Sequence, residues 1–155
     1  MVELGRAGYL KQAVIYLSNQ DYASAYSLCR EFAGKFPDDM MAHFLFSKAA
    51  FWAADYRESA SAARKAFNLA KTPEDMLPCA VLASTAYHEL GEYLKGYEIL
   101  KAMERIKSSE EVEKLLFIFS VDLREGREAL SHMDELRRLN RKAAEEFMMK
   151  VISQF

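Results

Sequence analysis

Apolar stretches with helical spacing fill most of this chain, and short polar turns interrupt them at regular intervals. Three of these turns consist of two variable residues, an acidic residue and a tyrosine: Asn19-Gln20-Asp21-Tyr22, Ala53-Ala54-Asp55-Tyr56 and Leu90-Gly91-Glu92-Tyr93. The second turn begins 34 residues after the first, and the third begins 37 residues after the second. A turn that recurs at such a period is typical of a helical repeat array.

Superposing the three turns brings residues of the same kind into register on both sides. Small residues occupy one position before the turn and one after it: Ala13, Ser47 and Ser84, then Ala25, Ser59 and Gly96. Apolar or aromatic residues occupy two other shared positions: Tyr16, Ala50 and Tyr87, then Phe32, Ala66 and Met103. Small residues at matched positions allow two antiparallel helices to pack closely, so each turn is predicted to join such a pair.

The register divides the first two thirds of the chain into three units, at about 6–39, 40–73 and 77–108. Pro37 ends the first unit, and the longer step to the third unit falls near residues 71–75. There Thr72 and Asp75 form a capping-box pattern with Pro73 at the first helical position. A second interpretation starts the helix near Leu77, which makes Pro78 an ordinary first-turn proline. The sequence leaves both starts open.

The last third of the chain carries a weaker version of the same pattern. An S-x-x-E cap at Ser108-Ser109-Glu110-Glu111 predicts helices over 112–123 and 127–139, with Gly126 between them. We interpret residues 109–140 as a degenerate fourth unit. An apolar stripe with i, i+3, i+4, i+7 spacing then predicts an amphipathic helix over 141–155 that caps the array. The stripe comprises Ala144, Phe147, Met148, Val151, Ile152 and Phe155.

Composition supports an all-α chain and argues against nucleic acid as a partner. Only six Gly and three Pro occur in 155 residues, which leaves few helix breakers. The net charge is -2, and 21 basic and 23 acidic residues are interspersed, so no single-sign field attracts nucleic acid. The one basic cluster, Arg137, Arg138, Arg141 and Lys142, is expected to pair at i, i+4 spacing with Asp134, Glu145 and Glu146.

The expected location is the cytoplasm, and no membrane association is expected. The opening residues MVELGRAGYL contain no apolar stretch of the length that a secretory signal requires. No apolar run in the sequence approaches the length of a membrane span. Cys29 and Cys79 lie within helix-like patterns, as expected of buried thiols in a reducing compartment.

The scarce reactive residues do not predict an enzyme, a metal site or a cofactor. His43, His88 and His132 fall in three different units, and none has a second His or Cys at metal-ligand spacing. Neither cysteine has a nearby histidine that could activate it, and no Gly-rich phosphate loop is present. We expect His43 to fill an aromatic slot in the core, and His132 to face solvent or the packing of the fourth unit.

These features resemble the tetratricopeptide repeat (TPR) superfamily. The stretch Gly8–Asp39 carries the most complete likeness, through Tyr9, Ala13, Tyr16, Asp21, Tyr22, Ala25 and Pro37. The second unit departs from the pattern with His43 at its first aromatic position. The resemblance implies an all-α, right-handed superhelix of antiparallel helix pairs. This chain would have three clear repeats, a degenerate fourth repeat and a C-terminal capping helix within one domain, 1–155.

The resemblance also implies a binding face, because the first helix of each TPR unit lines the concave surface. The predicted partner-binding residues are Leu10, Val14, Leu17, Phe44, Leu45, Lys48, Phe51, Trp52, Val81, Leu82, Thr85 and His88. Lys11, Ser18 and Glu89 would accompany them, and most members of the full set are apolar. TPR modules that clamp an acidic C-terminus use Lys, Arg and Asn, whereas this face offers only Lys11 and Lys48. An apolar groove suits the apolar face of a helix or a hydrophobic peptide instead.

The sequence therefore predicts a non-enzymatic protein-interaction module that acts as an adaptor or assembly scaffold. Two other functions fit the same features. The chain could be a homodimerising TPR subunit of a large complex, or a TPR-type secretion chaperone that holds a client segment. A further interpretation of Phe44, Phe51 and Trp52 is that they are core residues covered by a neighbouring unit or the tail helix.

Overall fold

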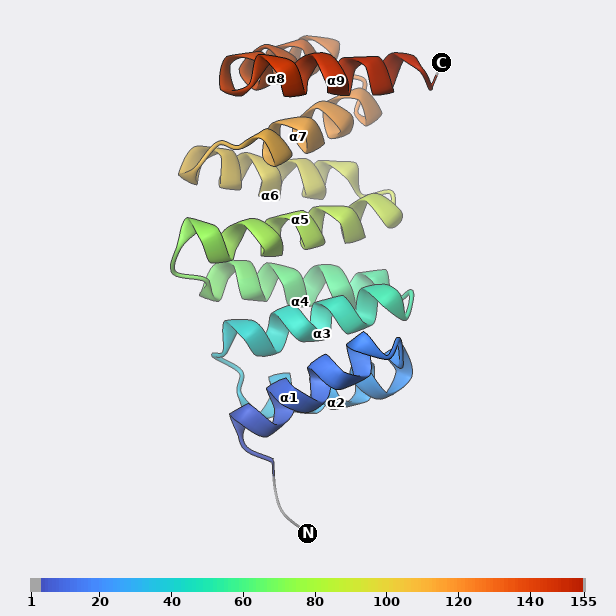
Figure 1. Cartoon of the computed structure of the whole chain (residues 1–155), viewed down its shortest axis with the longest axis vertical. Helices are drawn as coiled ribbons and strands as arrows, with labels where there is room; N and C mark the ends of the chain where they lie inside the picture. Colours follow the sequence, from blue (N-terminus) through green and yellow to red (C-terminus); the bar gives the residue numbers. More distant parts are fainter. Residues whose placement is uncertain (1–3, 155) are drawn as a thin grey trace. The chain divides into compact units, whose positions relative to one another are not determined.

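The computed structural model describes residues 4–154, which form nine α-helices and no strand. No helix in this range has the length and apolar character needed to cross a membrane. Each predicted turn lies between two helices (Figure 1). Phe155, the last member of the predicted tail stripe, lies outside the described residues. The helices are α1 (Arg6–Ser18), α2 (Tyr22–Lys35), α3 (Met40–Trp52), α4 (Tyr56–Leu69), α5 (Pro73–Glu89), α6 (Tyr93–Ile106), α7 (Glu110–Asp122), α8 (Gly126–Leu139) and α9 (Arg141–Ile152).

The helices group into two compact units, and the division along the chain falls inside the third turn, between Gly91 and Glu92. Unit 1 contains α1 to α5, and each helix packs on the next, with α3 also contacting α1 and α5. Unit 2 contains α6 to α9, again with each helix packed on the next. Figure 1 shows unit 1 from blue to green and unit 2 from yellow to red. The expectation of a single domain over 1–155 stays a prediction.

One backbone geometry recurs at all four turns. Gln20, Ala54, Gly91 and Arg124 have positive φ angles of 58°, 63°, 72° and 60°. At the first turn, the backbone N–H of Asp21 donates to the carbonyl oxygen of Tyr16 at 2.9 Å. This bond and a left-handed residue just past the helix end define a Schellman stop. The fourth turn, at Arg124, has the same form, which supports the predicted degenerate repeat.

Side-chain caps start most of the helices and resolve the ambiguity around Pro78. The carboxylates of Asp21 and Asp55 accept bonds from backbone N–H groups of α2 and α4, both at 3.3 Å. Thr72 accepts from the backbone N–H of Asp75 at 3.2 Å, so α5 begins at Pro73 and Pro78 lies inside it. The predicted N-cap at Thr72 and the start at Pro73 are therefore confirmed, and the later start near Leu77 is wrong.

The core of unit 1 is built from aromatic rings and from the small residues of the repeat register. The rings of Tyr9 and Phe32 stack with centroids 5.1 Å apart. At the close approach of α3 and α4, the Ser47 hydroxyl donates to the Ser59 carbonyl at 2.7 Å, and the Ser59 hydroxyl donates to the Ser47 carbonyl at 2.9 Å. Both serines are fully buried. The small positions predicted from the turns therefore lie where two helices meet.

In unit 2, α9 covers the apolar face that α7 and α8 present to it. Ala144 is buried with Met133 and Leu136 of α8, and Phe147 and Met148 pack beside them. The Phe147 ring meets Phe117 of α7 edge to face, with centroids 5.6 Å apart. The predicted cap thus covers α8, as terminal repeats require. Its last turn still leaves Ile152 exposed.

Candidate functional site

The twelve predicted partner-binding residues all lie on α1, α3 and α5, the first helices of the first three predicted pairs. These three helices belong to unit 1, and α3 lies between α1 and α5 in contact with both. Figure 1 shows them in blue, cyan and green. The repeat register therefore selected neighbouring helices. We call the surface formed by the twelve residues the inner face.

The apolar members of the inner face differ in exposure. Val14 and Trp52 are 53% and 57% exposed, whereas Leu45 is only 8% exposed and belongs to the core cluster. Partly buried side chains make up the remainder: Leu10, Leu17, Phe44, Phe51, Val81 and Leu82. The face is thus an apolar surface in which the side chains of Val14 and Trp52 are the most exposed, and Leu45 belongs to the core under it.

Aromatic contacts hold the exposed indole of Trp52 in place. It stacks on Tyr22, the first residue of α2, with centroids 5.8 Å apart. Phe51 meets it edge to face at 5.6 Å and also contacts Tyr56, the first residue of α4, at 5.3 Å. A large ring that is both exposed and fixed loses little conformational entropy on binding a partner.

Phe44 and Lys48 form a second element of the inner face, one helical turn apart on α3. The Lys48 ammonium lies 5.7 Å from the centre of the Phe44 ring, at cation–π distance. Phe44 also borders a crevice of about 60 Å³ that Met40, Met41, Asp75, Pro78 and Cys79 complete. The crevice lies between α3 and α5, where a small apolar side chain could insert.

The α5 side of the inner face offers fewer free polar groups than the sequence suggested. The Thr85 hydroxyl donates to the Val81 carbonyl at 2.7 Å, one turn earlier in the same helix. His88 is partly buried. Lys48 is therefore the most accessible polar group among the twelve residues.

Sequence reasoning missed a larger hollow at the junctions between repeats. It measures about 660 Å³ and is lined by residues before α3 and around the start of α5, including Phe36, Pro37, Leu69 and Lys71. Asp39 lines it and pairs with Arg6. The only signal in the sequence was the pair of proline-containing junctions, of which the first was interpreted as a helix stop and the second as a helix start.

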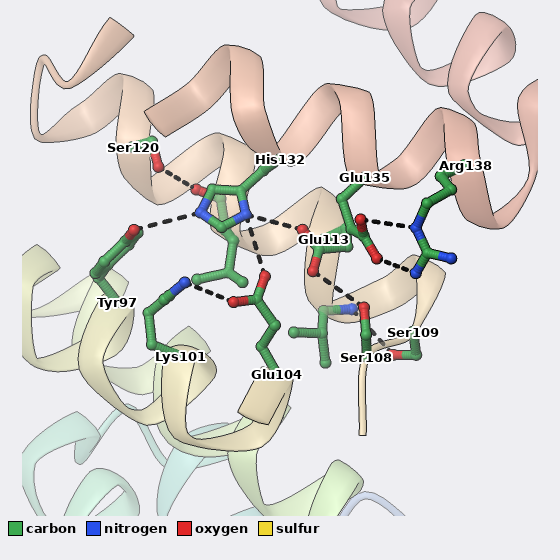
Figure 2. Close-up of polar contacts among 12 residues, drawn as sticks. Tyr97, Lys101, Glu104, Ser108, Ser109, Glu113, Ser120, His132, Glu135 and Arg138 are labelled. Carbon is green, nitrogen blue, oxygen red and sulfur yellow. Dashed lines mark hydrogen bonds and ion pairs between the residues drawn. The ribbon is translucent and has the colours of Figure 1, made fainter. Parts of the chain in front are cut away.

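Two of the histidines considered for chemistry, His43 and His132, have clear structural environments. His43 is buried, with Nε2 2.7 Å from the Pro37 carbonyl oxygen, so it occupies a core position as expected. His132 is also buried, 5% exposed, so it packs within the fourth unit rather than facing solvent. Its Nδ1 lies 2.8 Å from Oε2 of Glu113 (Figure 2).

The serine pair before α7 corrects one detail of the sequence interpretation. Ser109 alone caps the helix, accepting the backbone N–H of Val112 at 3.3 Å. Ser108 instead donates to Oε1 of Glu113 at 3.2 Å. The S-x-x-E pattern beginning at Ser108 therefore indicated a helix start in the right place, but the capping residue is Ser109. A sequence pattern does not say which side chain reaches the backbone N–H groups.

The basic cluster at the start of the tail is largely paired with acids. Arg137 contacts Asp134 at 3.0 Å, and Arg141 contacts Glu145 at 3.5 Å. Arg138 pairs with Glu135 rather than with the predicted Asp134. The i, i+3 partner replaces the i, i+4 partner, since both spacings place residues on one helix face.

Comparisons with solved structures show the fold. One match is TTC0263, a thermophilic TPR protein of Thermus thermophilus, with a TM-score of 0.66, 14% identity, and 90% of this chain and 78% of that chain covered. A MamA protein gives a TM-score of 0.76 at 16% identity, covering 90% and 75%. MamA 41-end from Desulfovibrio magneticus RS-1 gives 0.72 at 14% identity, covering 94% and 92%. No protein-family model and no curated protein matches the sequence.

The chain therefore has the TPR-like, all-α helical repeat fold that the turn register predicted. At these levels of identity, the likeness establishes the fold alone. Helical repeat folds of this kind build extended surfaces from the same helix of successive repeats. We expect the inner face to be such a surface.

Proposed function

We propose that this chain is a non-enzymatic protein-interaction module that binds a partner helix or a hydrophobic peptide on the inner face of unit 1. The observation that carries the proposal is Trp52, which is more than half exposed yet held by rings on two sides. Val14 and Phe44 extend the apolar surface along α1 and α3. An apolar surface on adjacent parallel elements suits the i, i+3, i+4, i+7 anchors of an amphipathic helix.

Selection from a random peptide library displayed on phage tests the proposal without a known partner. The full chain serves as bait, and a folded Phe44→Ala, Trp52→Ala double variant serves as the comparison bait. Enriched peptides are expected to contain apolar residues at helical spacing and to bind the double variant at least tenfold more weakly. Leu94→Ala is the matched control, because Leu94 is 58% exposed, lies on α6 in unit 2 and is not one of the twelve inner-face residues.

Two results would contradict this proposal. One is the absence of any enriched peptide, and the other is enrichment of peptides that bind the double variant and the original chain equally well. Clamping of an acidic C-terminus remains disfavoured as the mode of binding, since Lys48 is the only Lys or Arg among the twelve residues. Enriched peptides with acidic C-termini would restore it.

Self-association is a second candidate, favoured by a different surface. Met149 and Ile152 of α9 are 67% and 57% exposed after the helix has packed on α8. Exposed apolar residues on a terminal helix can pair two copies of a chain. Sedimentation over a wide concentration range distinguishes the candidates: a dimer that Met149→Lys dissociates supports this one, and a concentration-independent monomer removes it.

A further inference from the structure

Unit 2 contains a buried cluster of ligating side chains that the proposed function does not use. Glu104 of α6, Glu113 of α7 and His132 of α8 converge from three successive helices (Figure 2). One ligand atom from each lies within 4.8 Å of the others. Glu113 is fully buried and His132 nearly so, while the Glu104 side chain is 19% exposed.

The distance between His132 and Glu104 matches that between two ligands of one small ion, whereas the shorter contact between His132 and Glu113 is a hydrogen bond. Nδ1 of His132 is 2.8 Å from Oε2 of Glu113 and 3.3 Å from Oε2 of Glu104. A tetrahedral zinc site with bonds of about 2.0–2.1 Å holds its ligand atoms about 3.3–3.4 Å apart. Small side-chain adjustments would therefore bring the three atoms into the geometry of one site.

Each ligand is also oriented through its other polar atom. Oε1 of Glu104 contacts the Lys101 ammonium at 2.5 Å, and Oε1 of Glu113 accepts from the Ser108 hydroxyl at 3.2 Å. Nε2 of His132 lies 3.3 Å from the Tyr97 hydroxyl. Metal-binding proteins hold their ligands through outer contacts of this kind, which fix the ring orientation and the ligating atom.

The pKa values of the two carboxylates shift in opposite directions. Burial raises the pKa of Glu113, and the neighbouring Glu104 raises it further against the opposing effect of His132. Burial of Glu104 opposes the change, but hydrogen bonds with Glu113 and Lys101 leave its pKa lowered. The cluster thus holds two carboxylates beside the His132 imidazole and the Lys101 ammonium.

Solvent can reach the cluster through a hollow of about 360 Å³ on the surface of unit 2. Glu104 and His132 line it together with Lys101, Ser108, Ser131 and Glu135. The hollow supplies an entry path and space for a water molecule as a fourth ligand. Three protein ligands and an open fourth position form a common zinc arrangement.

From this geometry we propose that Glu104, Glu113 and His132 bind one Zn²⁺ ion per chain. Imidazole nitrogen with carboxylate oxygen is a ligand set that suits zinc better than Mg²⁺, which prefers oxygen alone. This proposal differs from the expectation, drawn from the sequence, that the chain binds no metal. It lies in unit 2 and is independent of the inner face.

Isothermal titration of the full chain with ZnCl₂, after removal of metals with a chelator, tests the site. We expect saturation at one ion per chain, and at least tenfold weaker binding by each of Glu104→Gln, Glu113→Gln and His132→Gln. His88→Gln is the matched control, since His88 is a partly buried histidine on α5. Its affinity should stay within twofold of the original chain.

Circular dichroism verifies that each variant is folded before titration. Glu104→Gln keeps the test valid if the two buried substitutions prevent folding, because Glu104 is partly exposed. The proposal is overturned if the original chain shows no saturable binding of one ion. It is equally overturned if Glu104→Gln binds Zn²⁺ within twofold of the original chain, or if His88→Gln weakens binding as strongly.

Discussion

At the scale of single residues, three of the four turns place a residue other than glycine in the left-handed backbone conformation. Ala54 has a φ of 63°, in the region where glycine is favoured and a side chain is strained. Gly91 is the only glycine at this position among the four turns. We expect Ala54→Gly to raise the free energy of unfolding by about 1 kcal/mol and Gly91→Ala to lower it by a similar amount.

Urea denaturation followed by circular dichroism measures both changes. Ala53→Gly is the control, since Ala53 has a φ of -85° and gains nothing from glycine. A fall in stability for Ala54→Gly would show that the left-handed conformation is not strained in the folded chain.

Burial should make both thiols unreactive in the folded protein. It raises the pKa of Cys29 to about 12 and that of Cys79 to about 11, with Asp75 adding to the second shift. A folded-state pKa above that of the unfolded chain favours the folded state below the unfolded value, about 8.5. This contribution is lost as the pH rises from about 8.5 through 11 and 12.

Reaction with a chromogenic disulfide reagent at pH 8 measures thiol access. We expect negligible reaction over minutes in the folded protein and rapid reaction of both thiols in denaturant. The Cys29→Ala, Cys79→Ala double variant gives the background. Rapid reaction of the folded chain would mean that unit 1 opens readily around α2 or α5.

At the scale of helices, Gly96 tests whether close packing sets the register in unit 2. A Cβ added at Gly96 would overlap the ring of Phe119, which is 1% exposed on α7. We expect Gly96→Ala to lower the free energy of unfolding by about 1–3 kcal/mol through overpacking. Gly34 on α2 has no neighbour within 4 Å of such a Cβ, so Gly34→Ala should raise it by about 0.5–1 kcal/mol.

Chemical denaturation of the two variants gives both signs in one experiment. The pair controls for helix propensity, because each change replaces Gly with Ala inside a helix. If Gly96→Ala were as stabilising as Gly34→Ala, the Phe119 ring would have moved aside, and the small residue at this position would have no packing role.

The helix pairs were predictable because their signals are local. Turn residues, caps and small positions act within a few residues, so Asp21, Asp55 and Thr72 marked helix starts correctly. The start of α5 was ambiguous because two local rules gave different answers. The capping-box pattern at Thr72 placed the start at Pro73, whereas Pro78 as a first-turn proline placed it near Leu77. The positive φ at Arg124 could not be predicted, because the residue at that position is not a glycine.

The candidate sites depended more strongly on packing between helices. The register predicted that α1, α3 and α5 carry the inner face, and in the structure α3 contacts both of the other helices. It did not distinguish the buried Leu45 from the exposed Trp52, because exposure is decided by neighbouring helices. Glu104, Glu113 and His132 show no metal-binding spacing in the sequence, and only the packing of three helices brings them together.

At the scale of the whole molecule, the repeat register assigns residues 1–155 to one domain. We predict that urea unfolds the chain in a single cooperative transition. Trp52, the only tryptophan, reports on unit 1 by fluorescence, and far-ultraviolet circular dichroism reports on all helices. Coincident midpoints support one domain, whereas a separate midpoint for Trp52 fluorescence would show that unit 1 unfolds independently.

The central claim is that the inner face of unit 1 binds apolar helical segments, and Trp52 fluorescence tests it most directly. Titration with a synthetic peptide obtained by the phage selection should shift Trp52 emission to shorter wavelength, because a partner would cover an indole that is now 57% exposed. The shift should saturate at one peptide per chain, and Phe44→Ala should weaken binding at least tenfold. Binding that leaves Trp52 emission unchanged and is insensitive to Phe44→Ala would contradict the claim.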